Sequence, residues 1–316
     1  MIVCGGENLM DVIEQPSTEG PRQFAAHAGG SPYNCSRAIG RLGGEVAYLG
    51  GVSTDSFGQQ LLSALGADSV QHLGPRPDAP TTLAMVTVQD GQPDYRFYRD
   101  GTADRLMTAS TMRAAFPDRA QALHLGSIAL IDGEDASAWQ DLFATVAQAG
   151  LFTSLDPNIR PLLADQHAAS YRARLNAMAA HTSLIKLSDE DAAWWFPGLS
   201  PQAALKALAS AAPQALIILT QGPGEVLCHV ADRDFSHRPA PLAHLADTVG
   251  AGDTLMAAVL VGLARRGALT PAALRTCEVD LLQEVVADAA RAAAITCTRT
   301  GCNPPLAQDL WGEAHA

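Results

Sequence analysis

From residue 122 onward, the sequence alternates short apolar runs with longer stretches in which apolar residues recur at helical spacing. The apolar runs predict buried strands at 122–125, 151–156, 184–187 and 216–220. A stretch such as 134–149 predicts a helix between two of these strands. Strands that alternate with helices favour an α/β fold, here a doubly wound, mainly parallel sheet flanked by helices.

A second pattern interrupts this alternation. Two apolar runs at 83–88 and 95–99, joined by the turn sequence DGQP, predict a β-hairpin. We expect the segments near 11–28 and 81–101 to form a small β-sheet lid, which would keep water from a reactive group. The 316 residues allow one large domain or two smaller ones. Because no linker or repeat divides the chain, we expect a single domain over 1–316.

The stretch at 247–260, DTVGAGDTLMAAVL, combines small residues, a carboxylate and the start of a predicted helix. Gly250 and Gly252 allow a ligand to approach the backbone closely. Their N–H groups, with that of Ala251, would face outward at the helix N-terminus and bind an anion. Asp253 follows directly. A carboxylate there repels a phosphate unless it has a role of its own, and a base for an attacking hydroxyl is one such role. An ordinary capped helix N-terminus is the alternative interpretation.

Polar clusters follow the predicted strands along the whole chain. Asp11 comes after the first apolar run, at 2–4, and further clusters lie at 156–160, 186–191, 220–225 and 247–253. The carboxyl ends of parallel strands share one edge of a sheet, so we expect these clusters to converge on one site. Asp11 would accept hydrogen bonds from the hydroxyls of a polyol there, although a turn carboxylate is an equally good interpretation of Asp11 alone.

Several classes of protein are disfavoured. Glu7 and Asn8 stand where a dinucleotide-binding GxGxxG would continue, and no GxxxxGK[ST] motif is present. The net charge of −12 argues against nucleic acid and anionic membranes as partners. The six cysteines lack zinc-type spacing, and the N-terminus lacks the pattern of a signal peptide. We therefore expect a cytoplasmic protein.

Two long motifs carry a resemblance to a known family. The first is GGSPYNCS at 29–36, followed by the turn DSFG at 55–58, and the second is the stretch at 247–260. DPNIR, IKLSDED and LTQGPGEV lie between them in the order typical of the family. The chain thus resembles the ribokinase or PfkB family of carbohydrate kinases over essentially its whole length. The resemblance implies a ribokinase-like fold and transfer of the γ-phosphoryl group of ATP to a sugar hydroxyl.

The resemblance also implies roles for individual residues. Asp253 resembles the catalytic base, and residues 250–252 resemble the anion hole for the γ-phosphoryl group. Three positions match those that bind the sugar, namely Asp11, Gly30 and Asn34. Thr220 and Gly222 match the turn that contacts the nucleotide, and the further candidates for nucleotide binding are Lys186, Gly224 and Gly252.

Two cation sites are expected from the same resemblance. Asp247 and the carbonyl of Val249 match a site for a monovalent cation, which makes K⁺ a candidate. Asp191 matches a carboxylate near the waters of Mg²⁺. The family often has Asn and Glu in that motif, and this chain has Ser188 and Asp191, whose side chain reaches less far. The expected cofactors are ATP and Mg²⁺.

The sugar is harder to assign. GENLMDVI, GGSPYN and FYRDGTAD resemble the fructokinases, so fructose is the expected substrate. The 2-keto-3-deoxygluconate kinases share the FYR and DPNxR features, and in such an enzyme Arg99 and Arg160 would bind a carboxylate. Another sugar or nucleoside kinase remains open as well. Asn158 is a further substrate-binding candidate, and Arg96 and Tyr98 share one face of the hairpin, either toward the substrate or in solvent.

A non-catalytic sugar or nucleotide sensor on the same fold is the alternative from another class. The intact carboxylate of Asp253 argues against a sensor, because a sensor does not need a base at that position. The expected partners are therefore a small sugar and ATP, without nucleic acid or membrane. The exposed lid would allow a homodimer through its edge.

Overall fold

A nine-stranded sheet forms the centre of the molecule. The computed structural model describes residues 1–15, 21–89 and 92–312. Seven strands of this sheet are parallel, and β12 and β13 add an antiparallel edge. Their order across the sheet is β13 (Arg233–His237), β12 (Val226–Val230), β11 (Leu216–Thr220), β10 (Leu184–Ser188), β9 (Phe152–Asp156), β8 (Ala122–Gly126), β1 (Ile2–Gly5), β4 (Val46–Leu49) and β5 (Gln71–His72).

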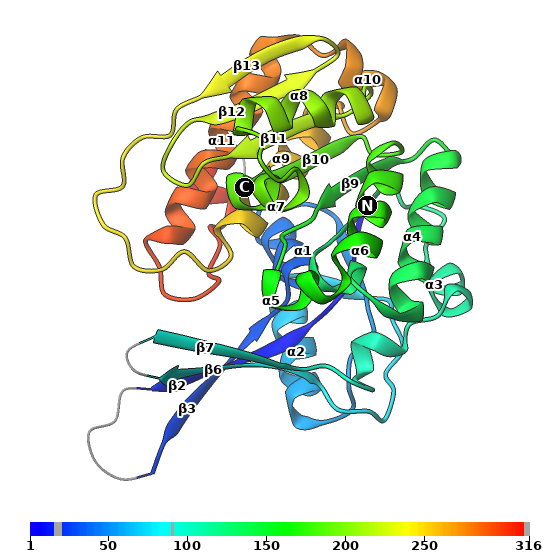
Figure 1. Cartoon of the computed structure of the whole chain (residues 1–316), viewed down its shortest axis with the longest axis vertical. Coiled ribbons are helices and arrows are strands. Elements are labelled where there is room, and N and C mark those ends of the chain that lie inside the picture. The colour runs from blue at the N-terminus through cyan, green and yellow to red at the C-terminus, as the bar shows by residue number, and fades with distance from the viewer. Residues whose placement is uncertain (16–20, 90–91, 313–316) are drawn as a thin grey trace.

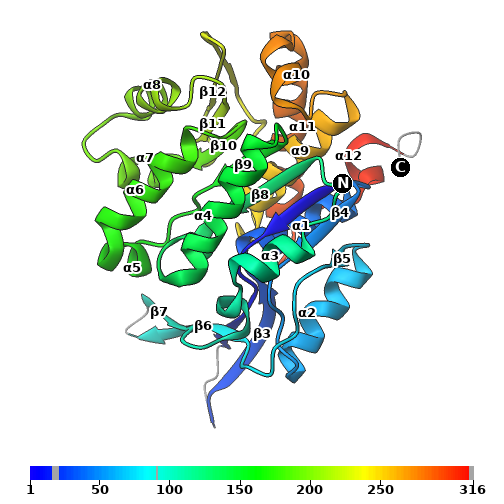
Figure 2. The same cartoon turned by 90° about the vertical axis from the view of Figure 1, so that its right-hand side faces the viewer.

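The strands of this sheet are apolar because helices cover both of its faces. Ile2 and Cys4 of β1 pack into one hydrophobic cluster, and Val3 between them packs into the other. The first face is covered by α1 (Ser31–Arg41), α2 (Ser56–Ala67), α9 (Ala251–Arg265), α10 (Pro271–Thr276), α11 (Val279–Cys297) and α12 (Ala307–Trp311). The opposite face is covered by α3 (Ala109–Ala115), α4 (Gly133–Gln148), α5 (Pro161–Ala164), α6 (Ala168–Ala179), α7 (Asp189–Trp195) and α8 (Pro201–Ala211) (Figure 2). The doubly wound α/β prediction is confirmed.

A smaller four-stranded sheet projects from this body as the predicted lid (Figure 1). Its order is β3 (Gln23–Gly29), β2 (Leu9–Gln15), β6 (Thr82–Gln89) and β7 (Gln92–Tyr98). The hairpin of β6 and β7 is antiparallel as predicted, whereas β2 pairs with β6 in parallel. The predicted turn at 90–93 lies partly outside the described residues. Because β2 follows β1 and β3 leads into α1, the lid is joined to the strand ends at the centre of the main sheet.

The order of the main sheet also sets the place for a ligand. β1 lies between β8 and β4, and the chain builds outward from β1 to β5 on one side and from β8 to β11 on the other. A sheet whose winding reverses in this way binds ligands at the carboxyl ends of the strands beside the reversal. The loops that follow β1, β8 and β9 meet there.

One helix boundary differs from the local pattern. The sequence predicts helices over 271–282 and 285–297, but α10 ends at Thr276 and α11 starts at Val279. The break lies at Cys277 and Glu278, which both adopt extended backbone angles. Nη1 of Arg233 in β13 donates a hydrogen bond to the carbonyl of Cys277 at 2.8 Å. This contact from a distant strand stabilises the break. It cannot be predicted from helical periodicity, which reflects only neighbouring residues.

Candidate active site

Asp253 lies on the first turn of α9 and is almost completely buried. Gly250 precedes the helix with a φ of 75°, a left-handed conformation that glycine adopts without strain. Oδ1 of Asp253 accepts hydrogen bonds from Oγ of Ser31 at 2.6 Å and Nδ2 of Asn158 at 3.4 Å. Oδ2 accepts one from Nδ2 of Asn34 at 3.0 Å. Segments far apart in the sequence thus converge on one carboxylate, and we call these four residues the Asp253 cluster.

Asn34 has an unused acceptor in this cluster. Its amide nitrogen is bonded to Asp253, but its buried Oδ1 has no hydrogen-bond partner among the described residues. A buried polar atom without a partner costs free energy unless a ligand or water satisfies it. The cluster is therefore suited to a ligand that carries hydroxyl donors.

The start of α9 also offers hydrogen-bond donors to an anion. In the described part of the chain, the N–H groups of Gly252 and Asp253 have no acceptor, as expected for the first turn of a helix. The N–H group of Ala251 differs from the prediction, because it donates to the carbonyl of Thr248 at 3.2 Å. Of the three N–H groups expected to bind the anion, those of Gly250 and Gly252 have no acceptor among the described residues, and that of Asp253 adds a further donor.

Packing adds a second reason for glycine at position 250, beside its left-handed backbone conformation. A Cβ atom at Gly250 would collide with Sγ of Cys302, and one at Gly252 would lie 2.7 Å from Nζ of Lys186. Cys302 is 52 residues from Gly250 in the chain and contacts this turn only through the tertiary fold. Lys186, a predicted nucleotide-binding residue, does lie beside the start of α9.

Lys186 is buried beside several carboxylates. Its Nζ lies 2.9 Å from Oδ2 of Asp156, at the end of β9. Burial alone would lower the pKa of Lys186, but Asp156 and Asp191 outweigh it, so its pKa is raised and the ammonium stays charged. Burial raises the pKa of Asp156 to about 6, against the lowering effect of Lys186. The site thus holds a permanent positive charge next to the free N–H groups of α9.

The lid contributes Asp11 to the same region. Burial raises the pKa of Asp11 to about 6, with Arg160 and His27 acting to lower it and Asp253 to raise it. His27 pairs with Asp11 across β2 and β3, and Nη1 of Arg160 donates to Oδ1 of Asn158 at 2.6 Å. Asn158 and Arg160 are therefore in direct contact, and Asp11 lies near enough to Arg160 for its charge to lower the pKa of Asp11.

Gly30 joins the lid to α1 at a close approach of two backbone segments. Its φ is 106°, and a Cβ atom there would lie 2.6 Å from the carbonyl oxygen of Glu7. A larger residue would push α1, and with it Ser31 and Asn34, away from Asp253. Gly30 therefore acts in this site through its backbone.

Arg99, Arg96 and Tyr98 are not brought to Asp253 by any described contact. The guanidinium of Arg99 is buried, forms an ion pair with Asp132, and donates to the carbonyl of Ile128 at 3.0 Å. Arg96 and Tyr98 are exposed on β7 of the lid, where Tyr98 is 53% exposed. The buried ion pair of Arg99 favours a structural role for this residue over substrate contact, and the roles of Arg96 and Tyr98 stay predictions.

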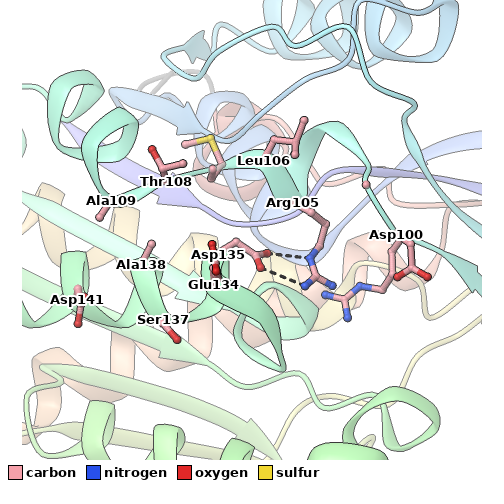
Figure 3. A pocket seen from close by; sticks show the side chains of 13 residues that line it. Asp100, Arg105, Leu106, Thr108, Ala109, Glu134, Asp135, Ser137, Ala138 and Asp141 are labelled. Atoms are coloured by element: carbon pink, nitrogen blue, oxygen red, sulfur yellow. Dashed lines mark hydrogen bonds and ion pairs between the residues drawn. The ribbon is translucent and has the colours of Figure 1, made fainter.

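Arg99 belongs instead to a second charged cluster, formed by Arg99, Arg105, Asp132 and Asp135, which we call the Asp132 cluster. It borders a cavity of about 560 Å³ between the end of the lid, α3 and α4 (Figure 3). Figure 3 shows Arg105 bonded to Asp135 at this cavity. Arg99 is the one predicted site residue that lines it. The cavity is thus separate from the Asp253 cluster.

The remaining predicted positions lie in loops around the start of α9 and the ends of β10 and β11. Asp247 accepts hydrogen bonds from the N–H groups of Val249 at 3.0 Å and Gly301 at 2.9 Å. These bonds join the loop before α9 to the C-terminal loop. Thr220 ends β11, and Gly222 and Gly224 follow it in a partly exposed turn.

Asp191 is buried at the start of α7, where it forms a capping box with Ser188. Its two carboxylate oxygens accept hydrogen bonds from the N–H groups of Ser188 at 2.9 Å and Ile159 at 2.6 Å. Both oxygens keep a further lone pair for a bound water.

Comparison with known proteins identifies the family. The model of the family described as pfkB family carbohydrate kinase matches residues 1–309. The chain belongs to this family. A fructokinase from Rhizobium leguminosarum bv. trifolii is 37% identical to this pfkB kinase over 276 residues, which cover 85% of this chain and 82% of the relative. A probable fructokinase from Arabidopsis thaliana is 31% identical, over 97% of this chain and 94% of the relative.

A solved structure shares the whole fold of this pfkB kinase. The crystal structure of a fructokinase with bound ATP from Xylella fastidiosa has a TM-score of 0.88 and 28% sequence identity, and the match covers 99% of this chain and 98% of that one. The ribokinase-like fold expected from the sequence is confirmed by this match. Among the described helices of this chain, none has the length and apolar character needed to cross a membrane.

The site of this pfkB kinase fits ATP with Mg²⁺. Lys186 and the free N–H groups of α9 would hold the phosphates of ATP. The described residues contain no group of three or more His, Cys, Asp and Glu side chains that could enclose a metal ion. Mg²⁺ bound to nucleotides keeps several waters and needs only one or two carboxylates, so Asp191 is a suitable partner for such a water.

Three residues of the site were not predicted from the sequence. The hydroxyl of Ser31 contacts Asp253, the carboxylate of Glu7 holds the backbone of Ser31, and Cys302 packs on Gly250. Ser31 precedes Asn34 by three residues in a helix and therefore shares its face, which is a signal that could have found it. Glu7 and Cys302 carry no comparable local signal.

Proposed function

We propose that this pfkB kinase is an ATP-dependent fructokinase, which transfers the γ-phosphoryl group to a primary hydroxyl of fructose. The observation that carries the proposal is the Asp253 cluster. A buried carboxylate stands at a helix N-terminus with free N–H groups, beside the unsatisfied acceptor of Asn34. The two features together accommodate a hydroxyl nucleophile and a phosphoryl group.

The chemistry follows from this arrangement. Asp253 takes the proton of the attacking hydroxyl, which raises the nucleophilicity of its oxygen. The charge on the phosphoryl oxygens is stabilised by the N–H groups of Gly252 and Asp253 and by the ammonium of Lys186. Asp191 would hold Mg²⁺ through a bound water, and the metal ion would supply further positive charge next to the phosphates. Asp156 keeps Lys186 in position through their buried ion pair.

Fructose is favoured by the relatives and by the side chains around the base. Fructokinases from bacteria and plants are similar to this chain over most of its length. Asp11, Asn34 and Asn158 supply acceptors and donors for the hydroxyls of a polyol. Arg99 is held by Asp132, so of the two arginines expected to bind a sugar acid such as 2-keto-3-deoxygluconate, Arg160 remains. A neutral sugar suits this site better.

The test is a coupled assay of ADP release with MgATP and a panel of acceptors. The panel contains fructose, 2-keto-3-deoxygluconate, ribose and inosine. We expect kcat/KM for fructose to exceed that for each of the others by at least about tenfold. This ratio is the effect of about one hydrogen bond that the site makes with fructose and not with the other acceptor. A higher kcat/KM for 2-keto-3-deoxygluconate than for fructose would show that the enzyme is a 2-keto-3-deoxygluconate kinase and not a fructokinase. Sugar binding without ADP release from any acceptor would favour the sensor.

Two further proposals concern K⁺ and assembly. We propose that Asp247 and the carbonyl of Val249 help to hold K⁺, since the loop before α9 leads directly to the anion site. Turnover should then be faster in KCl than in NaCl of equal ionic strength, and equal rates would contradict this. We also propose a homodimer through the lid, which light scattering at several protein concentrations would detect as a doubled mass.

A further inference from the structure

The two oxygens of the Asp253 carboxylate differ in how completely the protein uses them. Oδ1 accepts two hydrogen bonds, from Oγ of Ser31 at 2.6 Å and Nδ2 of Asn158 at 3.4 Å. Oδ2 accepts one, from Nδ2 of Asn34 at 3.0 Å. A carboxylate oxygen has two lone pairs, so Oδ1 is filled and Oδ2 keeps one free. The unsatisfied Oδ1 of Asn34 belongs to the amide that contacts this free side.

Ser31 is held firmly in the position that fills Oδ1. It is the first residue of α1 and is only 7% exposed. Its backbone N–H donates to Oε1 of Glu7 at 2.9 Å, and Oε2 of Glu7 accepts from the N–H of Ala129 at 3.2 Å. Glu7, in the loop after β1, thus ties the start of α1 to the segment after β8. The hydroxyl of Ser31 reaches Asp253 from a fixed backbone.

We infer that Ser31 is a positioning residue for phosphoryl transfer, and that its hydroxyl holds Oδ1 of Asp253 so that Oδ2 faces the acceptor hydroxyl of the sugar. This inference rests on the proposed kinase function. A short hydrogen bond to a charged oxygen is among the strong ones, and it fixes the rotation of the carboxylate. Without it, the carboxylate can turn, and its productive orientation is populated for less of the time.

The reaction then uses one defined oxygen. The acceptor O–H bond breaks and its proton passes to Oδ2 of Asp253, while the acceptor oxygen bonds to the γ-phosphorus. The bond from that phosphorus to the oxygen bridging the β- and γ-phosphates breaks, and ADP leaves with the electron pair. A neighbouring sugar hydroxyl donates to the unsatisfied Oδ1 of Asn34. Ser31 is not consumed and does not touch the reacting atoms.

The test compares Ser31→Ala, Ser31→Thr and the control Ser36→Ala with the wild type. Ser36 lies on the same helix, is fully buried, and donates its hydroxyl to the carbonyl of Tyr33 at 2.7 Å, without a described contact to Asp253. Steady-state rates are measured with fructose and MgATP, and the concentration of folded enzyme is checked by thermal unfolding.

We expect Ser31→Ala to lower kcat about tenfold, since a hydrogen bond to a charged group is lost. KM for fructose and for MgATP should each change less than about threefold, because the hydroxyl of Ser31 is already used by its hydrogen bond to Asp253. Ser31→Thr keeps the hydroxyl and should restore kcat to within about threefold of the wild type. Ser36→Ala should keep the wild-type kcat. A general loosening of the helix would affect KM and stability as well, so this pattern separates positioning from folding.

Other results for these variants would contradict either the role of Ser31 or the proposed kinase function. An unchanged kcat in Ser31→Ala, or an equal loss in Ser36→Ala, overturns the role of Ser31 while the kinase function stands. A loss in Ser31→Ala that threonine does not restore overturns the assignment to the hydroxyl. Absence of ADP release by the wild type with every acceptor overturns the proposed function, and the role of Ser31 with it.

Discussion

The Asp253 cluster and the Asp132 cluster both gather polar side chains near the junction of the lid and the main sheet, but they balance charge differently. Asp253 is bonded by neutral donors, from Ser31, Asn34 and Asn158. Asp132 is bonded by two guanidinium groups, those of Arg99 and Arg105. Burial alone would raise the pKa of Asp132, but these two arginines lower it below its ordinary value.

This difference in charge pairing suits the Asp253 cluster to catalysis and the Asp132 cluster to a structural role. A carboxylate whose charge is fully paired by arginine is a poor base, because the pairing stabilises its ionised form. The Asp253 cluster also has an unsatisfied acceptor, Oδ1 of Asn34, and it lies beside the free N–H groups at the start of α9. Both can bind a ligand. The Asp132 cluster instead anchors the end of β7 to the segment before α4.

The largest effect is expected from Asp253→Asn. The variant keeps the size of the side chain and loses the base, so kcat with fructose should fall about 10³-fold. ATP affinity, measured by calorimetry, should stay within about threefold, because the phosphates are held by other groups. A kcat near that of the wild type would show that Asp253 is not the base. The contrast between a catalytic Asp253 cluster and a structural Asp132 cluster would then be wrong.

Arg99→Gln should affect folding and leave catalysis unchanged. Loss of the buried partner of Asp132 should lower the free energy of unfolding in urea by about 2 kcal/mol, less than for a completely buried pair because Asp132 keeps Arg105 and some solvent. Arg119→Gln is the control, since Arg119 pairs with Glu45 on the exposed surface, and its cost should stay below about 0.5 kcal/mol. A selective increase of KM for the sugar in Arg99→Gln would contradict the structural role.

The binding of fructose should depend on pH through Asp11. Burial raises the pKa of Asp11 to about 6, so the carboxylate is charged above that pH and protonated below it. A protonated Asp11 accepts fewer hydrogen bonds, and KM for fructose should rise about tenfold between about pH 7.5 and about pH 5. In Asp11→Asn, this rise should disappear. An identical pH profile in both proteins would exclude Asp11 from sugar binding.

The smallest effect is expected from Arg160→Gln, the counterpart of Arg99→Gln at the Asp253 cluster. Loss of one hydrogen bond at the sugar site should raise KM for fructose about fivefold. The side chain is exposed, so the free energy of unfolding should change by less than about 0.5 kcal/mol. An unchanged KM together with a lower free energy of unfolding would instead give Arg160 a structural role like that of Arg99.

The sequence predicts the fold class well because its signals are local. Apolar runs at 122–125 and 216–220 lie in β8 and β11, and the hairpin at 83–99 lies in β6 and β7 of the lid. Asp253, Asn34 and Asn158 are also found together, since residues at the carboxyl ends of parallel strands and at the adjoining helix starts share one edge of the sheet. The parallel pairing of β2 with β6 and the break at Cys277 depend on distant contacts and were not predicted.

Local sequence patterns are enough to predict the doubly wound fold, the small lid sheet and the carboxylate of Asp253 at the start of α9. Periodicity and helix-start motifs act over a few residues, and both can be read without the rest of the chain. Three contacts are visible only in the folded chain: Arg99 pairs with Asp132, Cys302 packs against Gly250, and Ser31 fills one oxygen of Asp253. The partners in these contacts are between 33 and 222 residues apart in the chain, so packing selects them and no local pattern encodes the choice.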